Sequence, residues 1–426
     1  MKKLSLILAV MAALTMFTVP ASAATQWNFG ASLRYLSFWS ERDAGNAGAA
    51  DLQGGGARVH NDGLLDWGTQ SNSRVVMYMQ SDHMEGFIDM GYNVNSNKVS
   101  AREYWGRYRF SDQAFIAIGH QKQLFNQYIS NQVWDGDLGM GGIGIAYQSA
   151  APKITLGYGG FALALAKPYD RRVNARREAI ANDMRDLYAS LIDPSVKVGL
   201  AVDIDTSFPQ LQGRYEYSGD AWRIKLVGAY QYIRINKIDG YWENPAFGGG
   251  RSFSAGNTGV HSWLAGLDGD VDFGPLNLAA ATSFGQNWSD AGWNDETSNM
   301  DGLWTGRYMF NNFGVVPVFD MLAPVGGGKV PVAWKSTTSF MLSFVGAYRL
   351  TEALRFEAGA GYRYDRNGAF RRDGHIWHAY LQAAYTIAPG FTVTPEIGYI
   401  DFGKHVISKN YMGDIWYVGA QWRMDF

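Results

Sequence analysis

The fold of this chain is decided by the stretch Trp416-Tyr417-Val418-Gly419-Ala420-Gln421-Trp422-Arg423-Met424-Asp425-Phe426. Its residues alternate strictly: every second one, from Trp416 to Phe426, is apolar or aromatic, and the residues between them are small, polar or charged. Because successive side chains of a β-strand point to opposite faces, the stretch is predicted to be a strand with one apolar and one polar face. The edge strand of a soluble β-sandwich alternates in the same way, so the rest of the chain must distinguish the two.

The first residues have the pattern of a secretory signal peptide. Lys2 and Lys3 form a positive start, residues 4–17 are apolar and uncharged, and Ala21-Ser22-Ala23 is a small-residue cleavage site. We therefore expect residues 1–23 to be a signal peptide and residues 24–426 to form a single exported domain.

Composition narrows the class of protein further. The chain has no cysteine, which excludes Cys-ligated zinc, iron–sulfur clusters and covalently attached haem. Its formal net charge of −2 gives no reason to expect nucleic acid as a partner. Aromatic residues make up 15% of the chain and Gly occupies 51 positions, yet no apolar run after the signal is long enough for a membrane helix. Since only helices and closed barrels pair every backbone polar group in lipid, the sequence predicts a transmembrane antiparallel β-barrel.

The alternating segments predict the number of strands. Sixteen can be counted, an even number as in bacterial single-chain barrels. Short connections of Ser, Asp, Gly and Pro, one of them at 150–152, alternate with long ones, as periplasmic turns and outer loops do. Residues 195–205 also alternate; we interpret them as the returning limb of a loop or an upward extension of the next strand, and eighteen strands remain the alternative. The predicted strands are 27–39, 69–80, 84–94, 99–110, 114–121, 142–148, 153–166, 210–217, 221–235, 260–273, 276–288, 334–350, 354–365, 375–387, 391–402 and 414–426.

Three short stretches resemble those of a known family. They are the loop after the fifth strand with Asp135-Gly136-Asp137-Leu138, the strand start Phe208-Pro209-Gln210-Leu211-Gln212-Gly213-Arg214-Tyr215-Glu216-Tyr217, and the last strand through Phe426. With them the chain resembles the bacterial outer-membrane porins, most nearly the homotrimeric porins of sulfate-reducing bacteria. The resemblance implies a homotrimer in the outer membrane that lets small hydrophilic solutes diffuse passively. Two features depart from enteric porins: the Pro-Glu-Phe-Gly-Gly run is missing from the constriction loop, and the loop at 95–98, which latches a neighbouring subunit there, is short.

The resemblance also implies a constriction site. In general porins the loop at residues 122–141 folds into the lumen, so Asp135 and Asp137 would form the acidic side of a narrow pore. Opposed charges there would create a transverse field that orients polar solutes. A solvated loop with an Asx-turn explains Asp-Gly equally well, and a calcium site is disfavoured because few ligands lie nearby. The basic wall would come from inward-facing Arg34, Arg74, Arg107, Arg109, Arg214, Arg223, Lys225, Arg355 and Arg363.

Two other features have a functional and a structural interpretation. Apolar residues at helical spacing between 174 and 193 predict a short amphipathic helix in an outer loop, with Arg171, Arg172, Arg176 and Arg177 at its start. It is either a basic lid over the barrel mouth or a helix packed on the rim with solvated charges. His375 and His378 should point to opposite faces of a strand and make a poor metal pair.

The sequence favours a passive pore over other classes of function. No nucleophile or acid–base set indicates an enzyme, and no cofactor is expected. The alternatives are a substrate-specific channel, in which Tyr78 and Trp105 stack sugars in the lumen, and a structural or adhesive barrel that uses the long 289–333 loop. The expected partners are outer-membrane lipid and the barrel assembly machinery, which would recognise a C-terminal signal formed by Trp422, Met424 and Phe426.

Overall fold

The computed structural model describes residues 25–43, 63–70, 72–93, 98–134, 140–168, 197–206, 208–244, 249–255, 257–293, 316–319, 332–368, 373–404, 411 and 413–426. The expected signal peptide, the expected helix between 174 and 193, and both Asp135 and Asp137 lie outside the described residues.

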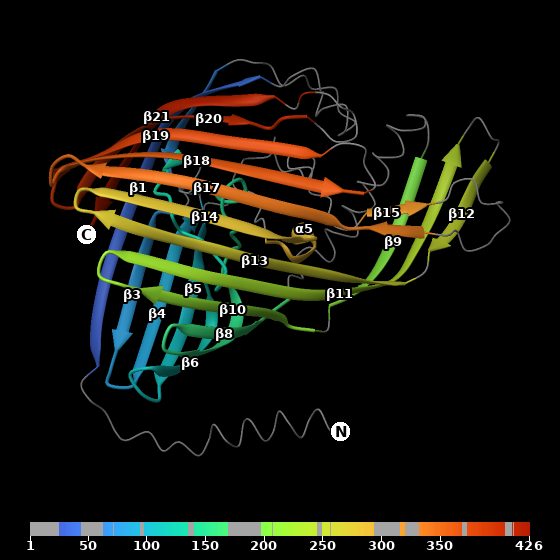
Figure 1. The fold of residues 1–426 in the computed structure, drawn as a ribbon, viewed down its shortest axis with the longest axis horizontal. Coiled ribbons are helices and arrows are strands. Elements are labelled where there is room, and N and C mark those ends of the chain that lie inside the picture. The colour runs from blue at the N-terminus through green and yellow to red at the C-terminus, as the bar shows by residue number, and fades with distance from the viewer. Residues whose placement is uncertain are drawn as a thin grey trace.

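Sixteen antiparallel strands close into a barrel, as the sequence predicted (Figure 1). In the described part of the long connection between β14 and β17 lie a separate two-stranded sheet and a short helix. The elements are β1 (Gln26–Asp43), β2 (Leu64–Thr69), β3 (Arg74–Gln80), β4 (Met84–Asn93), β5 (Lys98–Arg109), β6 (Ala114–Gln121), β7 (Ala151–Tyr158), β8 (Phe161–Ala166), β9 (Lys197–Asp205), β10 (Gln210–Ser218), β11 (Trp222–Asn244), β12 (Gly249–Ala255), β13 (Thr258–Phe273), β14 (Leu276–Gln286), α5 (Trp288–Ala291), β15 (Val316–Phe319), β16 (Val332–Lys335), β17 (Thr337–Arg349), β18 (Leu354–Asn367), β19 (Gly374–Ala388), β20 (Phe391–Asp401) and β21 (Asp414–Asp425).

Some barrel strands consist of two consecutive pieces. β2 and β3 both pair with β1, β9 and β10 both pair with β11, and β12 and β13 also both pair with β11. β9 and β12 flank the far half of β11, and Figure 1 shows these three projecting together beyond the barrel. The alternation at 195–205 is therefore an upward extension of the following strand, and eighteen strands are not needed to explain it.

The barrel closes between its first and last strands. β1 pairs with β21 from Ser32 opposite Asp425 to Asp43 opposite Asp414. Backbone hydrogen bonds in both directions between Ala31 and Phe426, at 3.2 and 2.9 Å, extend the seam. Closure matters because an open sheet edge would leave backbone N–H and C=O groups without partners in lipid.

One part of the predicted strand order is wrong. Residues 142–148 are not a barrel strand, and 153–166 contain two strands, β7 and β8, joined at Gly159-Gly160 instead of one strand that starts after a turn at 150–152. Alternation reports only that one face is buried, and Ile143 and Ile145 are buried inside the barrel without belonging to the ladder. The two errors cancel, so the predicted count of sixteen is still correct.

The two faces of the wall differ as the alternation predicted. On β8 the side chains of Phe161, Leu163 and Leu165 are 46–51% exposed on the outside, and the alanines between them face inward and are buried. The last strand repeats the pattern, with Trp416 exposed outside and Gln421 buried inside. Within the part of the chain that is described, no helix is long and apolar enough to cross a membrane.

A lipid-facing position should reject charge in a way that depends on depth. Leu267 points outward on β13, six positions before Phe273 at the turn. We expect Leu267→Arg to lower the free energy of unfolding by about 2–4 kcal/mol and Phe273→Arg by about 0–1 kcal/mol, because only the first guanidinium is held near the bilayer midplane. Denaturant titration in lipid vesicles measures both; equal costs would contradict a lipid-facing outer surface.

Candidate functional site

A segment that follows β6 lies inside the barrel. We call its described residues, 122–134 and 140–150, the inner segment. It hydrogen-bonds to inward-facing groups on β10, β11, β13, β14, β18, β19, β20 and β21. The inner segment therefore lines one side of the lumen and narrows it.

Glu357 on β18 is the most heavily bonded anchor of the inner segment. Its carboxylate accepts the backbone N–H of Asn131 at 2.7 Å and the side-chain amide of the same residue at 2.8 Å. The Tyr380 hydroxyl donates to it at 2.7 Å, and Arg355 forms an ion pair with it at 2.8 Å. Because Glu357 is only 1% exposed, its charge requires these partners, and they in turn fix the position of Asn131.

A second wall carboxylate holds the segment two residues later. Buried Glu396 on β20 accepts the backbone N–H of Val133 at 2.7 Å. The next residue, Trp134, stacks flat on Tyr417 of β21, with ring centroids 4.3 Å apart and an interplanar angle of 8°. Alternation places both wall residues on the inward face of their strands. The first limb of the inner segment, residues 122–134, is therefore held at its end by a carboxylate and by ring stacking.

Gln127 joins the two limbs of the inner segment to the wall. Its amide nitrogen donates to the backbone carbonyls of Leu267 and Thr282 at 3.2 and 3.1 Å. Its amide oxygen accepts the backbone N–H of Ala146 at 3.0 Å and the Ser283 hydroxyl at 2.9 Å. One side chain thus connects the limb before the undescribed residues, the limb after them, and the strands β13 and β14.

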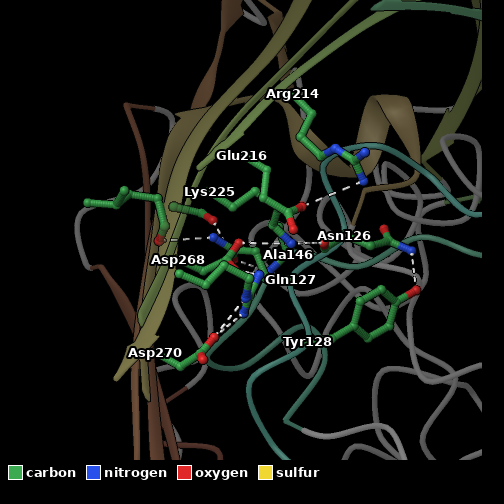
Figure 2. A network of polar contacts seen from close by, with 12 residues as sticks. Asn126, Gln127, Tyr128, Ala146, Arg214, Glu216, Lys225, Asp268 and Asp270 are labelled. Carbon is green, nitrogen blue, oxygen red and sulfur yellow. Dashed lines mark hydrogen bonds and ion pairs between the residues drawn. The ribbon is translucent and has the colours of Figure 1, made fainter. Parts of the chain in front are cut away.

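Ion pairs on β11 and β13 support the first limb of the inner segment (Figure 2). Lys225 donates to the backbone carbonyl of Asn126 at 2.9 Å and pairs with Asp268 at 3.1 Å. Arg223 pairs with Asp268 at 3.1 Å and with Asp270 at 2.7 Å. Breaking a buried pair leaves an uncompensated charge, so Lys225 is held toward the inner segment by its neighbours rather than free in the lumen.

The second limb of the inner segment, residues 140–150, packs with its backbone directly against the backbone of the wall. A Cβ added to Gly361 on β18 would lie 3.1 Å from the Cα of Gly144, so a larger residue there would push the limb away from the wall. Two positions further along β18, the buried guanidinium of Arg363 donates to the carbonyl of Gly142 at 2.8 Å. The missing side chain of Gly361 therefore leaves room for Gly144, and Arg363 supplies the hydrogen bond that holds Gly142.

The predicted basic residues do lie on the inner wall, but carboxylates accompany most of them. The inward ion pairs are Arg74–Asp89 at 3.3 Å, Arg107–Glu85 at 3.0 Å, Arg109–Glu85, Arg214–Glu216 at 3.9 Å, Lys225–Asp268 at 3.1 Å and Arg355–Glu357 at 2.8 Å. Arg34 is buried on β1 and donates to the Ser32 hydroxyl at 3.3 Å.

The two charges of these pairs are not equally open to the lumen. On β4 and β5 the side chains of Arg107 and Arg109 are 29% and 41% exposed, whereas Glu85 between them is 3% exposed. In the pair between β3 and β4, the Arg74 side chain is likewise more exposed than that of Asp89. Water in the lumen therefore meets guanidinium groups along this wall, with the carboxylates beneath them.

An aromatic row crosses the same wall. Tyr78 on β3 lies opposite Phe87 on β4, which lies opposite Trp105 on β5. The rings of Phe87 and Trp105 are 5.6 Å apart, and the Arg107 guanidinium lies 5.1 Å from the Trp105 ring centre. The inward orientation of Tyr78 and Trp105 agrees with the alternation, and Phe87 completes a row that the sequence did not single out.

The sequence did not reveal how the inner segment is anchored. The available signal was its content of side-chain amides, which is high for a solvated loop: Gln123, Asn126, Gln127, Asn131, Gln132 and Gln148. His375 and His378 do face opposite ways, the first exposed and the second buried. Across the described residues, no three His, Cys, Asp or Glu side chains are grouped as a metal ion would need.

The sequence matches no protein-family model and no curated protein. The structure is similar to the outer-membrane channel DcaP of Acinetobacter baumannii, with TM-score 0.55, 13% identity, 96% of this chain and 99% of that one covered. An anion-selective porin from Comamonas acidovorans matches with TM-score 0.49 and 10% identity, covering 95% of this chain and 100% of that one. The in-vitro folded trimer form of OmpT from Vibrio cholerae matches with TM-score 0.49 and 11% identity, again covering 95% of this chain and 100% of that one. At 13% identity the likeness to DcaP shows a shared barrel fold.

Removing the main anchor should free the inner segment. Glu357→Ala leaves Asn131 and Arg355 without their buried partner, so we expect a loss of about 3–5 kcal/mol in the free energy of unfolding and rapid proteolysis within residues 122–149. The control is Glu216→Ala, since Glu216 is an inward carboxylate in a loose 3.9 Å pair and its loss should cost less than about 0.5 kcal/mol. Equal protease resistance of the two variants would show that Glu357 does not hold the segment.

Proposed function

We propose that the chain forms a water-filled pore in the outer membrane of a Gram-negative cell, through which small hydrophilic solutes and ions diffuse passively. The observation that carries the proposal is the division of the lumen: the inner segment is anchored on one side, and solvent-exposed guanidinium groups such as that of Arg107 line the wall of β3–β5. A barrel with a packed apolar interior would have no reason to keep charges open to water.

Asp135 and Asp137 are proposed as the acidic side of a constriction. Their neighbours support this: Trp134 stacks on the inner wall, and the backbone N–H of Met140 donates to Gln132 at 3.2 Å. In the sequence, Asp135 directly follows Trp134, and Asp137 is three positions from both Trp134 and Met140. Guanidinium groups across the lumen would complete a transverse field.

The aromatic row favours a second candidate, a channel specific for sugars. Tyr78, Phe87 and Trp105 lie opposite one another on three neighbouring strands of the inner wall, and aromatic rings can stack on sugar rings. A specific channel predicts that a sugar blocks the ion current and that Trp105→Ala abolishes the block. An adhesive barrel is the third candidate. In that case, deletion of residues 294–315 would abolish surface binding and leave the conductance unchanged.

Assembly and location form part of the proposal. We propose a homotrimer, a location in the outer membrane after removal of the signal peptide, and recognition of Trp422, Met424 and Phe426 by the barrel assembly machinery. The outward exposure of these three side chains supports the last point. The kinship with porins of sulfate-reducing bacteria stays a prediction from the sequence.

Current recordings test the pore and its constriction. Purified protein in planar bilayers should give ohmic conductance steps, and a folded barrel without any conductance would refute the pore. Asp135→Asn with Asp137→Asn should then shift the permeability ratio toward anions, because two fixed negative charges leave a narrow passage. The shift should shrink at 1 M salt, where the Debye length is about 3 Å.

A matched pair controls for charge in general. Asp82→Asn with Asp112→Asn removes two exposed carboxylates from the short turns after β3 and β5, and the permeability ratio should change far less. If both pairs shift the ratio equally, or neither does, the acidic side of the constriction is elsewhere.

Deletion of Phe426 separates recognition from packing. The side chain of Phe426 is exposed to lipid, and its backbone bonds to Ala31 at the seam. We expect the yield in the outer membrane to fall about tenfold or more, while the unfolding free energy of protein refolded in detergent changes by about 1–2 kcal/mol, as for loss of one terminal bond pair. Equal proportional losses in both settings would indicate a packing role alone.

A further inference from the structure

One cluster of outward side chains occurs on β11 and β13. Tyr230, Tyr232 and Arg234 follow each other at every second position of β11, beside His261 and Trp263 on β13. Tyr230 lies opposite Trp263, and Tyr232 opposite His261. The Tyr230 hydroxyl is 2.8 Å from Nδ1 of His261, whose ring centre is 5.1 Å from that of Tyr232.

The same cluster recurs four barrel strands further on. Tyr362, Tyr364 and Arg366 alternate along β18, beside His375 and Trp377 on β19. Tyr362 lies opposite Trp377, and Tyr364 opposite His375. The Tyr362 hydroxyl is 2.6 Å from Nδ1 of His375, whose ring centre is 5.2 Å from that of Tyr364. Residue types, register and contacts therefore all repeat.

The two clusters also lie at the same height. Arg234 comes twelve positions after Trp222, where β11 begins, and Arg366 comes twelve positions after Leu354, where β18 begins. At about 3.3 Å per residue and a tilt of about 40°, twelve positions rise about 30 Å, slightly more than the apolar band of about 25 Å. Each arginine therefore reaches the headgroup level at the end of the barrel that carries the long connections.

The polar groups of the clusters face the membrane rather than the lumen. Arg366 is 70% exposed, and Arg234, His261 and His375 are exposed as well. An aromatic belt alone would account for the tyrosines and tryptophans, which are enriched at both membrane interfaces. It does not account for an arginine and a histidine held at fixed places beside them on two separate strand pairs.

We propose that the two clusters bind the phosphate-bearing headgroup of an outer-leaflet glycolipid. A guanidinium matches phosphate geometry with paired donors, an imidazole adds a further hydrogen bond, and the tyrosine and tryptophan rings supply faces for sugar rings and acyl chains. A carboxylate lies near each arginine: Asp205 is opposite Arg234 in the ladder, and Asp373 is 3.9 Å from Arg366. One carboxylate does not saturate the five donors of a guanidinium. The proposal rests on the outer-membrane location but not on conduction.

Native mass spectrometry of the full-length barrel, titrated with diphosphoryl lipid A in detergent, tests the proposal. The wild type should retain two lipid A molecules, and Arg234→Gln or Arg366→Gln should each remove one. In the double variant both sites should bind about tenfold more weakly, the loss expected for a charge-assisted phosphate contact, so that neither lipid is retained at the concentration at which the wild type holds two. Conductance should stay unchanged in all three variants, so a barrel that binds lipid A but does not conduct would refute the pore alone.

Two comparisons make the test specific. His120→Gln is the matched control, because His120 also stacks on an outward tyrosine, Tyr104, with ring centroids 5.3 Å apart, and should not alter binding. Lipid A stripped of its phosphates should be retained about tenfold less than the intact lipid. The proposal is overturned if the double variant binds like the wild type, if phosphatidylglycerol is retained as well as lipid A, or if millimolar inorganic phosphate occupies the sites in its place.

Discussion

The interior of this barrel depends on how backbone that is not in a strand satisfies its hydrogen bonds. The inner segment lies away from the ladder, and a buried N–H without a partner is costly. Glu357 and Glu396 supply the acceptors, one for Asn131 and one for Val133. Both carboxylates come from strands, so the wall determines where the inner segment runs.

These anchors give the lumen two unlike sides. On the anchored side, the charged groups are buried and are used in ion pairs and hydrogen bonds that hold the inner segment, as with Lys225 and Asp268. On the side of β3–β5, guanidinium groups such as that of Arg107 remain open to water, above carboxylates that hold them in place. A solute in transit would meet donors and ring faces on one side and the polar backbone of the inner segment on the other.

The sequence predicted the wall well because each strand reports its own environment. Alternation in β21 follows directly from lipid outside and water inside, and that prediction proved correct. It misassigned residues 142–148 because Ile143 and Ile145 alternate with small residues for another reason, packing inside the lumen. Periodicity describes which face is buried but not which neighbour buries it.

Contacts between distant segments could not be predicted in the same way. Alternation predicts which arginines face inward, but their pairing with carboxylates on other strands depends on register, as for Arg107 and Glu85. The bond between Asn131 and Glu357 joins residues 226 positions apart, and no local pattern encodes it. The fold was thus available from periodicity, whereas the anchoring of the inner segment required the structure.

The central claim is that the inner segment borders the path of ions, and a single cysteine tests it most directly. The chain has no native cysteine, and Tyr128 on the inner segment is 50% exposed, so Tyr128→Cys offers one reactive thiol at the proposed passage. A charged methanethiosulfonate added during a single-channel recording should lower the current in one step, while Ile118→Cys on the outer face should give no step. A Tyr128→Cys barrel that is fully modified by mass yet carries an unchanged current would contradict the account.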